Sequence, residues 1–182
     1  MTLDPEWALG RRARLPDALR VLAEAYPRGQ WEAHGNFGEM VQFWMQRHAM
    51  FRDLVGVLRS DAETVADGAM DMNAYAPRLS RYGGMFLNEL HMHHNVEDQH
   101  YFPQLIQLDA RLEQGFELLE ADHDAIDPML HQLAEAANAV LQGGEIGVLH
   151  ERIVGFGDLL ERHLTDEEEI VVPVILASGF RG

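Results

Sequence analysis

The sequence contains no cysteine. Disulfide bonds, iron–sulfur clusters, thiolate zinc sites and cysteine nucleophiles are therefore excluded, and any metal ion must be held by nitrogen and oxygen atoms. Positive charge is also scarce, because 14 basic residues face 30 acidic ones and the formal net charge is −16. Such a surface repels phosphate backbones and anionic lipid headgroups, so neither nucleic acid nor a membrane is an expected partner.

Long apolar runs are absent as well. The longest, residues 170–177, has eight residues including Pro173, far short of the roughly 20 needed to cross a bilayer. The N-terminus contains arginines but no apolar stretch that could form the core of a signal peptide. With 182 residues, 47% of them hydrophobic, we expect a cytoplasmic protein with one hydrophobic core.

Strand patterns are also missing, since alternation with a period of two is absent and β-branched residues are few. Apolar residues instead recur at helical spacing in long stretches joined by short loops. The sequence predicts helices over residues 36–66, 73–107, 109–141 and 145–177. Four helices of this length with short connections predict an all-α fold, an antiparallel up-down-up-down four-helix bundle.

Residues 1–35 differ from the rest of the chain, because prolines and glycines divide them into short pieces. We expect a short helical N-terminal extension, with one helix over Leu15–Tyr26, that either covers one end of the bundle or mediates pairing of two chains. Asn36 followed by Glu39 resembles a capping box at the start of the first long helix. The predicted domains are this extension and the bundle, residues 36–177.

The second and fourth predicted helices contain the same pattern of polar residues. A shift of 70 positions aligns three residues of each helix: His93 with His163, Glu97 with Glu167, and Pro103 with Pro173. A shift of 75 places His48 of the first helix on His123 of the third. The chain thus reads as two copies of a helix with one histidine followed by a helix with His-x-x-x-Glu.

The repeated polar residues are expected to meet inside the bundle. His48 and His123 lie shortly before the midpoints of their helices and His93 and His163 shortly after, so antiparallel helices bring all four to one level. A histidine and a glutamate four positions apart share one helix face. Metal coordination removes the cost of burying unpaired polar groups. The predicted metal ligands are His48, His93, Glu97, His123, His163 and Glu167. The other three residues of the DEEE stretch around Glu167 are expected to face water.

These motifs and their order resemble the hemerythrin-like HHE cation-binding proteins, over about residues 36–177 and including Phe102-Pro103 after the first motif. The resemblance implies a non-heme centre of two iron ions, with the four histidines as terminal ligands, the two glutamates as bridges, and an optional oxo or hydroxo bridge. Imidazole and carboxylate ligands suit iron, with manganese and zinc as weaker candidates. The implied function is to bind, sense or react with dioxygen, peroxide or nitric oxide.

The remaining histidines do not take part in the repeat. His94 is turned by about 100° from His93 and could take its place if the helix were rotated. His100 forms a ferritin-type Glu-x-x-His with Glu97, but the equivalent position of the fourth helix is Ile170, so it is either a neighbour of the cluster or a surface residue. We expect four further histidines at the surface: His34, His91, His131 and His150.

The sequence departs at two places from the oxygen-carrying hemerythrins. The resemblance leads us to expect a terminal His-x-x-x-x-Asp, whereas the last helix has His163-x-x-x-Glu167. It also leads us to expect a second histidine on the third helix. Four positions after His123 stands Asp127 instead. One histidine is therefore expected to be missing, and the centre is expected to be more open.

Three alternatives stay open. A di-iron oxidoreductase, such as a peroxide-decomposing enzyme, would use the same ligands. A zinc-dependent four-helix protein of the DinB type would call for a His-x-x-x-His pair, which the sequence lacks. Facing histidines could also bind heme, but this would leave Glu97 and Glu167 unexplained.

Overall fold

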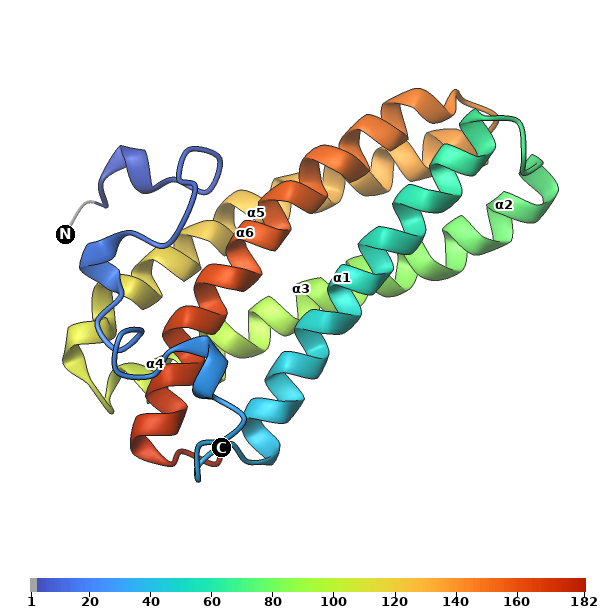
Figure 1. The fold of residues 1–182 in the computed structure, drawn as a ribbon. Helices are drawn as coiled ribbons and strands as arrows, with labels where there is room; N and C mark the ends of the chain where they lie inside the picture. Colours follow the sequence, from blue (N-terminus) through green and yellow to red (C-terminus); the bar gives the residue numbers. More distant parts are fainter. Residues whose placement is uncertain (1–2) are drawn as a thin grey trace.

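The computed structural model describes residues 3–182, and four long helices lie side by side in it (Figure 1). Every regular element in the described residues is helical, so the predicted all-helical class is confirmed. Three of the long helices are continuous: α1 (Glu39–Ala66), α5 (Glu113–Leu141) and α6 (Ile146–Ser178). The predicted ends agree with these bounds to within about one helical turn.

The second long helix consists of five consecutive segments with no loop between them. They are α2 (Met72–Arg78), the π-helical η4 (Leu79–Gly83), α3 (Gly84–Val96), the π-helical η5 (Glu97–Tyr101) and α4 (Phe102–Ile106). Asp71 caps the start, because its side chain accepts a hydrogen bond from the backbone N–H of Ala74 at 2.9 Å. A π turn shifts the helical register and frequently lies at a functional site, and η5 begins at Glu97.

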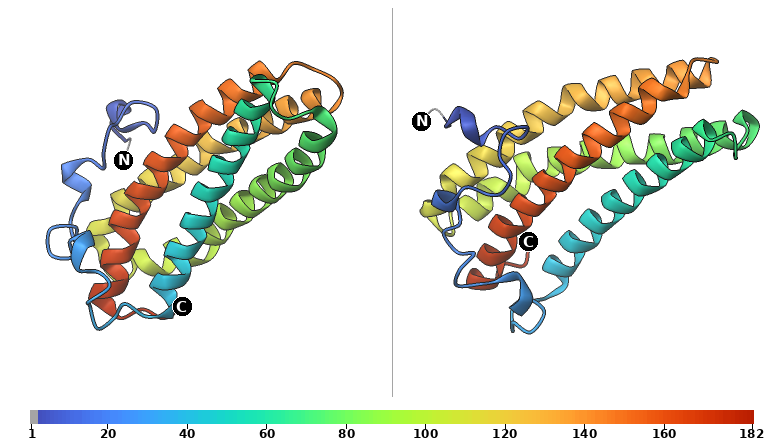
Figure 2. Two further views of the ribbon diagram at one scale, coloured as in Figure 1. Left: turned by 45° about the vertical axis from the view of Figure 1, so that its right-hand side comes forward. Right: turned by 45° about the horizontal axis from the view of Figure 1, so that its top comes forward.

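Short connections join the helices at alternate ends of the bundle. Figure 1 shows the α1–α2 and α5–α6 turns at one end. The connection from α4 to α5, which contains the 3-10 helix η6 (Ala110–Leu112), lies at the other end. The N-terminal segment and the C-terminus lie toward that same end, as the two further views in Figure 2 show. Helix α6 packs against both α1 and α5.

The capping box predicted at the start of α1 does not form. Gly38 is the N-cap residue, and no side chain caps the helix. The side-chain amide of Asn36 instead donates to the carbonyl oxygen of Leu176 at 2.7 Å. A tertiary contact with the end of α6 therefore replaces the local contact that the motif indicated.

The helix predicted over Leu15–Tyr26 is also wrong. Residues 3–35 contain only turns and three short 3-10 helices: η1 (Pro5–Trp7), η2 (Asp17–Leu19) and η3 (Arg28–Gln30). Leu15, Leu19 and Trp31 are buried in an apolar cluster that includes the C-terminal part of α6. Because so short a stretch gains little from helix formation alone, tertiary burial decides its backbone. The segment lies over one end of the bundle (Figure 2).

Two apolar clusters fill the bundle, and a layer of buried polar side chains separates them along the helices. One cluster includes Phe51 and later residues of α1, and the other includes Val41 and Trp44, which precede Phe51 in the same helix. His48 stands between the two, and α5 and α6 contain buried polar residues at equivalent places. Within residues 3–182, no helix is long and apolar enough to cross a membrane.

Candidate metal centre

The structure brings the six predicted side chains together in this polar layer. His48 comes from α1, His123 from α5, and the two His-x-x-x-Glu motifs from α3–η5 and from α6. All six are buried or nearly so, and His48, His163 and Glu167 are 0% exposed. A seventh residue, His94, is buried with them. Four different helices thus supply five imidazoles and two carboxylates.

The seven side chains form two groups. His48, His93, Glu97 and Glu167 each offer one atom, and these atoms lie within 4.8 Å of one another. His94, His123 and His163 offer three ring nitrogens that meet the same limit. Each group has the size and composition of a site for one cation.

The two carboxylates connect the groups. Glu97 places Oε1 at 2.9 Å from Nε2 of His93 and Oε2 at 3.7 Å from Nε2 of His123. Glu167 places Oε1 at 3.3 Å from Nε2 of His48 and Oε2 at 3.4 Å from Nε2 of His163. Each carboxylate therefore presents one oxygen to each group of histidines.

Seven of the atoms that face the cluster or lie beside it are buried and have no hydrogen-bond partner. They are Nε2 of His48 and His93, both ring nitrogens of His94, both oxygens of Glu97, and Oε2 of Glu167. Buried polar atoms are normally paired, and a cluster of unpaired ones is costly. Cations in the cluster would satisfy these atoms, apart from the one ring nitrogen of His94 that faces away from the cation, so the residues present fit the metal.

Three of the five histidines are held from behind by a carboxylate. In each pair Nδ1 of the ring donates to the carboxylate: His48 to Glu168 at 2.9 Å, His123 to Asp98 at 2.7 Å, and His163 to Asp122 at 3.2 Å. Because a carboxylate only accepts, Nδ1 carries a proton in each pair, and Nε2, the ring nitrogen that faces the cluster, is the one that can bind a cation. Such pairs fix the orientation of metal-binding histidines.

The expectation that the neighbours of Glu167 face water is wrong for two of them. Asp166 and Glu168 are 0% exposed, and Glu169 is half-buried. Arginines from other parts of the chain compensate the buried charges: Arg12 pairs with Asp166, and Arg28 and Arg52 pair with Glu168. The helical pattern of α6 gave no sign of these partners, because two of the three arginines come from the N-terminal segment.

His94 joins the cluster beside His93 and does not replace it. The ring of His93 lies 5.3 Å from that of His48, whereas the ring of His94 stacks on His123 at 4.0 Å. Adjacent residues of a helix point about 100° apart, so the two rings reach toward different neighbouring helices. The sequence offered His94 only as a substitute for His93, and no local pattern indicated that both rings face the cluster.

The other polar candidates lie outside the cluster. His100 is exposed and is bonded to Gln104. Asp127 is 49% exposed and lies near His91 at the surface, so it supplies nothing to the site. The remaining histidines, His34, His131 and His150, are exposed or half-buried and belong to neither group.

Burial keeps three of the histidines neutral. It lowers the pKa of His93 to about 3 and lowers the pKa of His94 well below its ordinary value. The pKa of His163 is also lowered by burial, despite the opposing effect of Asp122. A neutral imidazole is the form that binds a cation, so these rings are ready to coordinate at neutral pH.

The remaining charges compensate one another. Burial on its own would lower the pKa of His48, but the facing Glu167 and Glu168 raise it to about 9. Burial and the charge of Glu167 raise the pKa of Glu97 well above its ordinary value. His48 keeps the pKa of Glu167 low although burial opposes this. A cation that binds His48 at neutral pH must therefore displace its proton, and the raised pKa of Glu97 makes protonation of that carboxylate compete with cation binding as well.

A cavity of about 210 Å³ between α1 and α3 reaches the cluster. Its lining is Phe43, Trp44, Arg47, Glu89, Met92, His93, Val96, Glu97 and Tyr101. At its inner end the indole N–H of Trp44 donates to Oε1 of Glu167 at 2.5 Å. The cavity therefore connects the surface to the group that contains His93.

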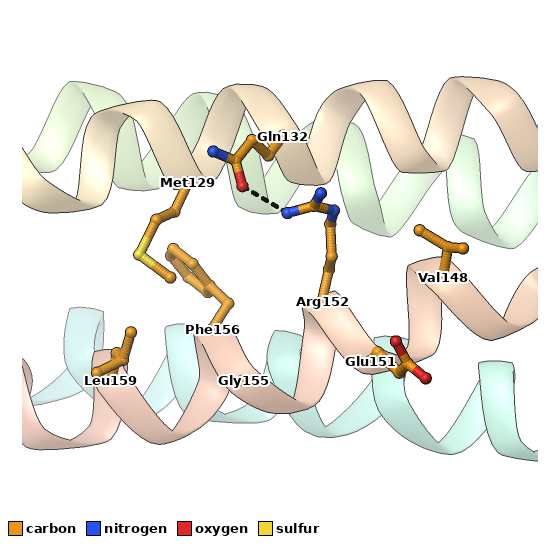
Figure 3. Close-up of a pocket in the computed structure, with 8 residues that line it drawn as sticks. All are labelled: Met129, Gln132, Val148, Glu151, Arg152, Gly155, Phe156 and Leu159. Carbon is orange, nitrogen blue, oxygen red and sulfur yellow. Dashed lines mark hydrogen bonds between the residues drawn. The ribbon is translucent and has the colours of Figure 1, made fainter. Parts of the chain in front are cut away.

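A second depression, of about 430 Å³, lies between α5 and α6 (Figure 3). Met129 and Phe156 form part of its wall, and the guanidinium of Arg152 donates to the side chain of Gln132. None of its lining residues belongs to the histidine–carboxylate cluster. It offers no route to the candidate site.

The fold and the site together define a helical-bundle protein with a buried cluster of imidazoles and carboxylates that suits cations. The model of the hemerythrin HHE cation binding domain matches residues 39–175, and the chain belongs to this family. Membership implies that a metal cation is bound. No curated protein and no solved structure matches the chain.

Proposed function

We propose that this protein holds two iron ions in the cluster and through them binds, senses or reacts with dioxygen, peroxide or nitric oxide. The observation that carries the proposal is that two buried carboxylates each present one oxygen to each histidine group. We assign the ligands as follows: His48 and His93 to the first cation, His94, His123 and His163 to the second, and Glu97 and Glu167 to both.

The donor set favours iron. All seven groups offer nitrogen or oxygen, which suits iron, manganese and zinc, and no thiolate is present to select a softer ion. When bound, iron supplies Lewis acidity together with a redox couple, which zinc lacks. Reaction with dioxygen, peroxide or nitric oxide requires such a couple, so the proposed function and the proposed metal depend on each other.

The two positions differ in the number of imidazoles. The first has two and lies beside the 210 Å³ cavity, whereas the second has three. His94 contributes the imidazole that Asp127 does not provide, so the sequence-based expectation of a more open centre applies to the first position alone. We therefore place the exchangeable ligand at the first position, on the side of His93.

The proposal includes the antiparallel up-down-up-down order predicted from the sequence. Connections at alternate ends of the bundle support it (Figure 1). In that order the histidines of α1 and α5, which precede the midpoints of their helices, meet those of the second long helix and α6, which follow the midpoints of theirs.

The second candidate function is that of a peroxide-decomposing di-iron oxidoreductase. One observation favours it: a cavity of about 210 Å³ is larger than a diatomic ligand needs. Multiple turnover with hydrogen peroxide or an organic peroxide would select this candidate. Stoichiometric reaction without turnover would select a binding or sensing protein.

Metal analysis tests the proposal directly. The chelated protein is loaded with iron(II) without air, desalted, and analysed for iron and zinc per chain, with optical spectra before and after exposure to air. We expect two irons per chain, near-ultraviolet charge-transfer bands after oxidation, and no Soret band. A single zinc, a heme spectrum, or a failure to retain iron would each overturn the proposal.

A further inference from the structure

Two arginines of the N-terminal segment pair with carboxylates that accept hydrogen bonds from histidines of the cluster. This segment precedes residue 39, where the match to the family begins. Arg12 binds Asp122, which accepts a hydrogen bond from His163. Arg28 pairs with Glu168, which accepts one from His48. The two histidines belong to different groups of the cluster.

The contact of Arg12 is buried and uses its whole guanidinium. Nη1 donates to Oδ1 of Asp122 at 2.8 Å, and Nη2 pairs with Oδ2 of the same carboxylate. Nε donates to Oδ2 of Asp166 at 2.7 Å, and Nη1 also donates to the carbonyl of Trp7 at 2.7 Å. The side chain of Arg12 is 3% exposed. A planar fork in a dry site fixes the carboxylate that it binds more firmly than a point charge does.

The backbone beside Arg12 is held as well. Arg162 of α6 donates to the carbonyl of Ala13 at 2.8 Å and also pairs with Asp166. The pairs formed by Arg12 and Arg162 therefore share one carboxylate, and together they attach this part of the segment to α6. These contacts of the backbone beside Arg12 also help to fix the position of its guanidinium.

The contact of Arg28 is weaker. Its Nη1 lies 2.7 Å from Oε2 of Glu168, but its side chain is 45% exposed. Arg52 of α1 binds the other oxygen of the same carboxylate at 2.7 Å. Arg52 therefore duplicates the role of Arg28, whereas nothing duplicates the bidentate contact of Arg12 with Asp122 among residues 3–182.

We infer that the N-terminal segment contributes to metal binding, because Arg12 is the positioning residue for His163 at the three-histidine position. This inference rests on the proposed function. By holding Asp122, Arg12 keeps the proton of His163 on Nδ1 and its Nε2 lone pair toward the second cation. Loss of Arg12 therefore weakens the second cation site and leaves the first intact.

The test compares Arg12→Gln and Arg12→Lys with the wild type and with Arg20→Gln in the full chain. Arg20 is a matched control, because it lies in the same segment and pairs with Glu169 of α6 at 3.4 Å. Glu169 makes no hydrogen bond to any histidine in the described part of the chain. Cobalt(II) titration without air, followed by visible absorption, resolves the two positions by their different imidazole content.

For Arg12→Gln we expect the affinity of one cobalt equivalent to fall about 10- to 100-fold, as for other residues that orient metal-binding histidines. The other equivalent should bind as in the wild type. Arg12→Lys retains the positive charge but not the planar guanidinium, so its affinity for that cobalt equivalent should lie between those of the wild type and Arg12→Gln. It also keeps the test valid if Arg12→Gln does not fold. Unchanged binding of both equivalents in Arg12→Lys and Arg12→Gln overturns the inference, as does equal weakening of both.

A second measurement needs no metal. Nitrogen-15 NMR of the imidazoles in the chelated protein reports which ring nitrogen carries the proton. We expect Arg12→Gln to change the His163 signals while His123, held by Asp98, keeps its Nδ1–H form. If the wild type binds no cation, the proposed function fails, yet this spectrum still decides the role of Arg12. An unchanged His163 signal overturns that role whatever the metal result.

Discussion

At the scale of single residues, the side chains of the cluster differ in how many cations they can touch. A carboxylate has two oxygens, whereas an imidazole whose Nδ1 carries a proton has one free nitrogen. Glu97 and Glu167 each face both histidine groups, and His48 faces one. Alanine substitution of either glutamate should therefore leave a different number of metal ions per chain than alanine substitution of His48.

Glu97→Ala and Glu167→Ala should each lose both metal ions, because each removes an oxygen from both positions. His48→Ala should lose one ion at most. Iron per chain, measured after anaerobic loading and desalting, checks this, with the exposed His100→Ala as a control that retains two. Two irons per chain in both glutamate variants would show that these carboxylates do not bridge.

His94→Ala should weaken the second position and leave the first unchanged, because its ring contacts His123 and lies on that side of the cluster. The matched control is His91→Ala, an exposed histidine of the same helix. Cobalt titration, with its two resolvable steps, is the measurement. If His94→Ala and His91→Ala bind both equivalents alike, His94 is only a packed ring.

At the scale of elements, the helices and their inward faces could be predicted from the sequence because both follow from local periodicity. The repeated spacing of His93–Glu97 and His163–Glu167 also predicted which side chains share a level. The inward turn of His94 and the buried state of Glu168 could not be predicted. The first depends on how neighbouring helices surround α3, and the second on arginines distant in sequence.

The cavity between α1 and α3 gives a prediction at this same scale. Val96 is 43% exposed and lines the cavity, so Val96→Trp should fill its mouth and slow the entry of an external ligand. Val148→Trp is the control, because Val148 is 58% exposed and lines the separate depression of Figure 3. Stopped-flow mixing of the oxidised, iron-loaded protein with azide should show severalfold slower binding for Val96→Trp alone. Equal rates in the two variants would place the entry route elsewhere.

At the scale of the whole molecule, the cluster links stability to metal. The polar layer lies between the two apolar clusters, so its unpaired atoms weaken the middle of the bundle when no cation is bound. A ligand that binds the native state alone adds RT ln(1 + [L]/Kd), about 4 kcal/mol at a thousandfold excess over Kd. Chelation should therefore lower Tm markedly, and readdition of iron(II) should restore it. A melting curve that does not respond to verified metal removal would indicate a site that contributes nothing to folding.

The stability of the metal-free protein should also depend on pH in both directions. Because the pKa values of His93, His94 and His163 are lowered, the unfolded chain binds more protons below the ordinary histidine value of 6.5, and stability falls as the pH falls from there. The raised pKa of Glu97 has the opposite effect on stability, but the three histidines outnumber this one carboxyl group. Above 6.5 those three imidazoles are neutral in both states and no longer contribute.

Between pH 6.5 and about 9 the folded chain keeps on His48 a proton that the unfolded chain releases, so stability falls again as the pH rises, and the raised pKa of Glu97 acts in the same direction. We therefore expect a maximum near pH 6.5 in denaturant midpoints of the chelated protein measured from pH 5 to 9. Glu97→Gln, which imitates the protonated acid, should flatten the alkaline side. Iron should move the maximum upward, because the cations bind the deprotonated ligands. Stability of the chelated protein that rises steadily from pH 6.5 to 9 would contradict the assigned directions of the pKa shifts of His48 and Glu97.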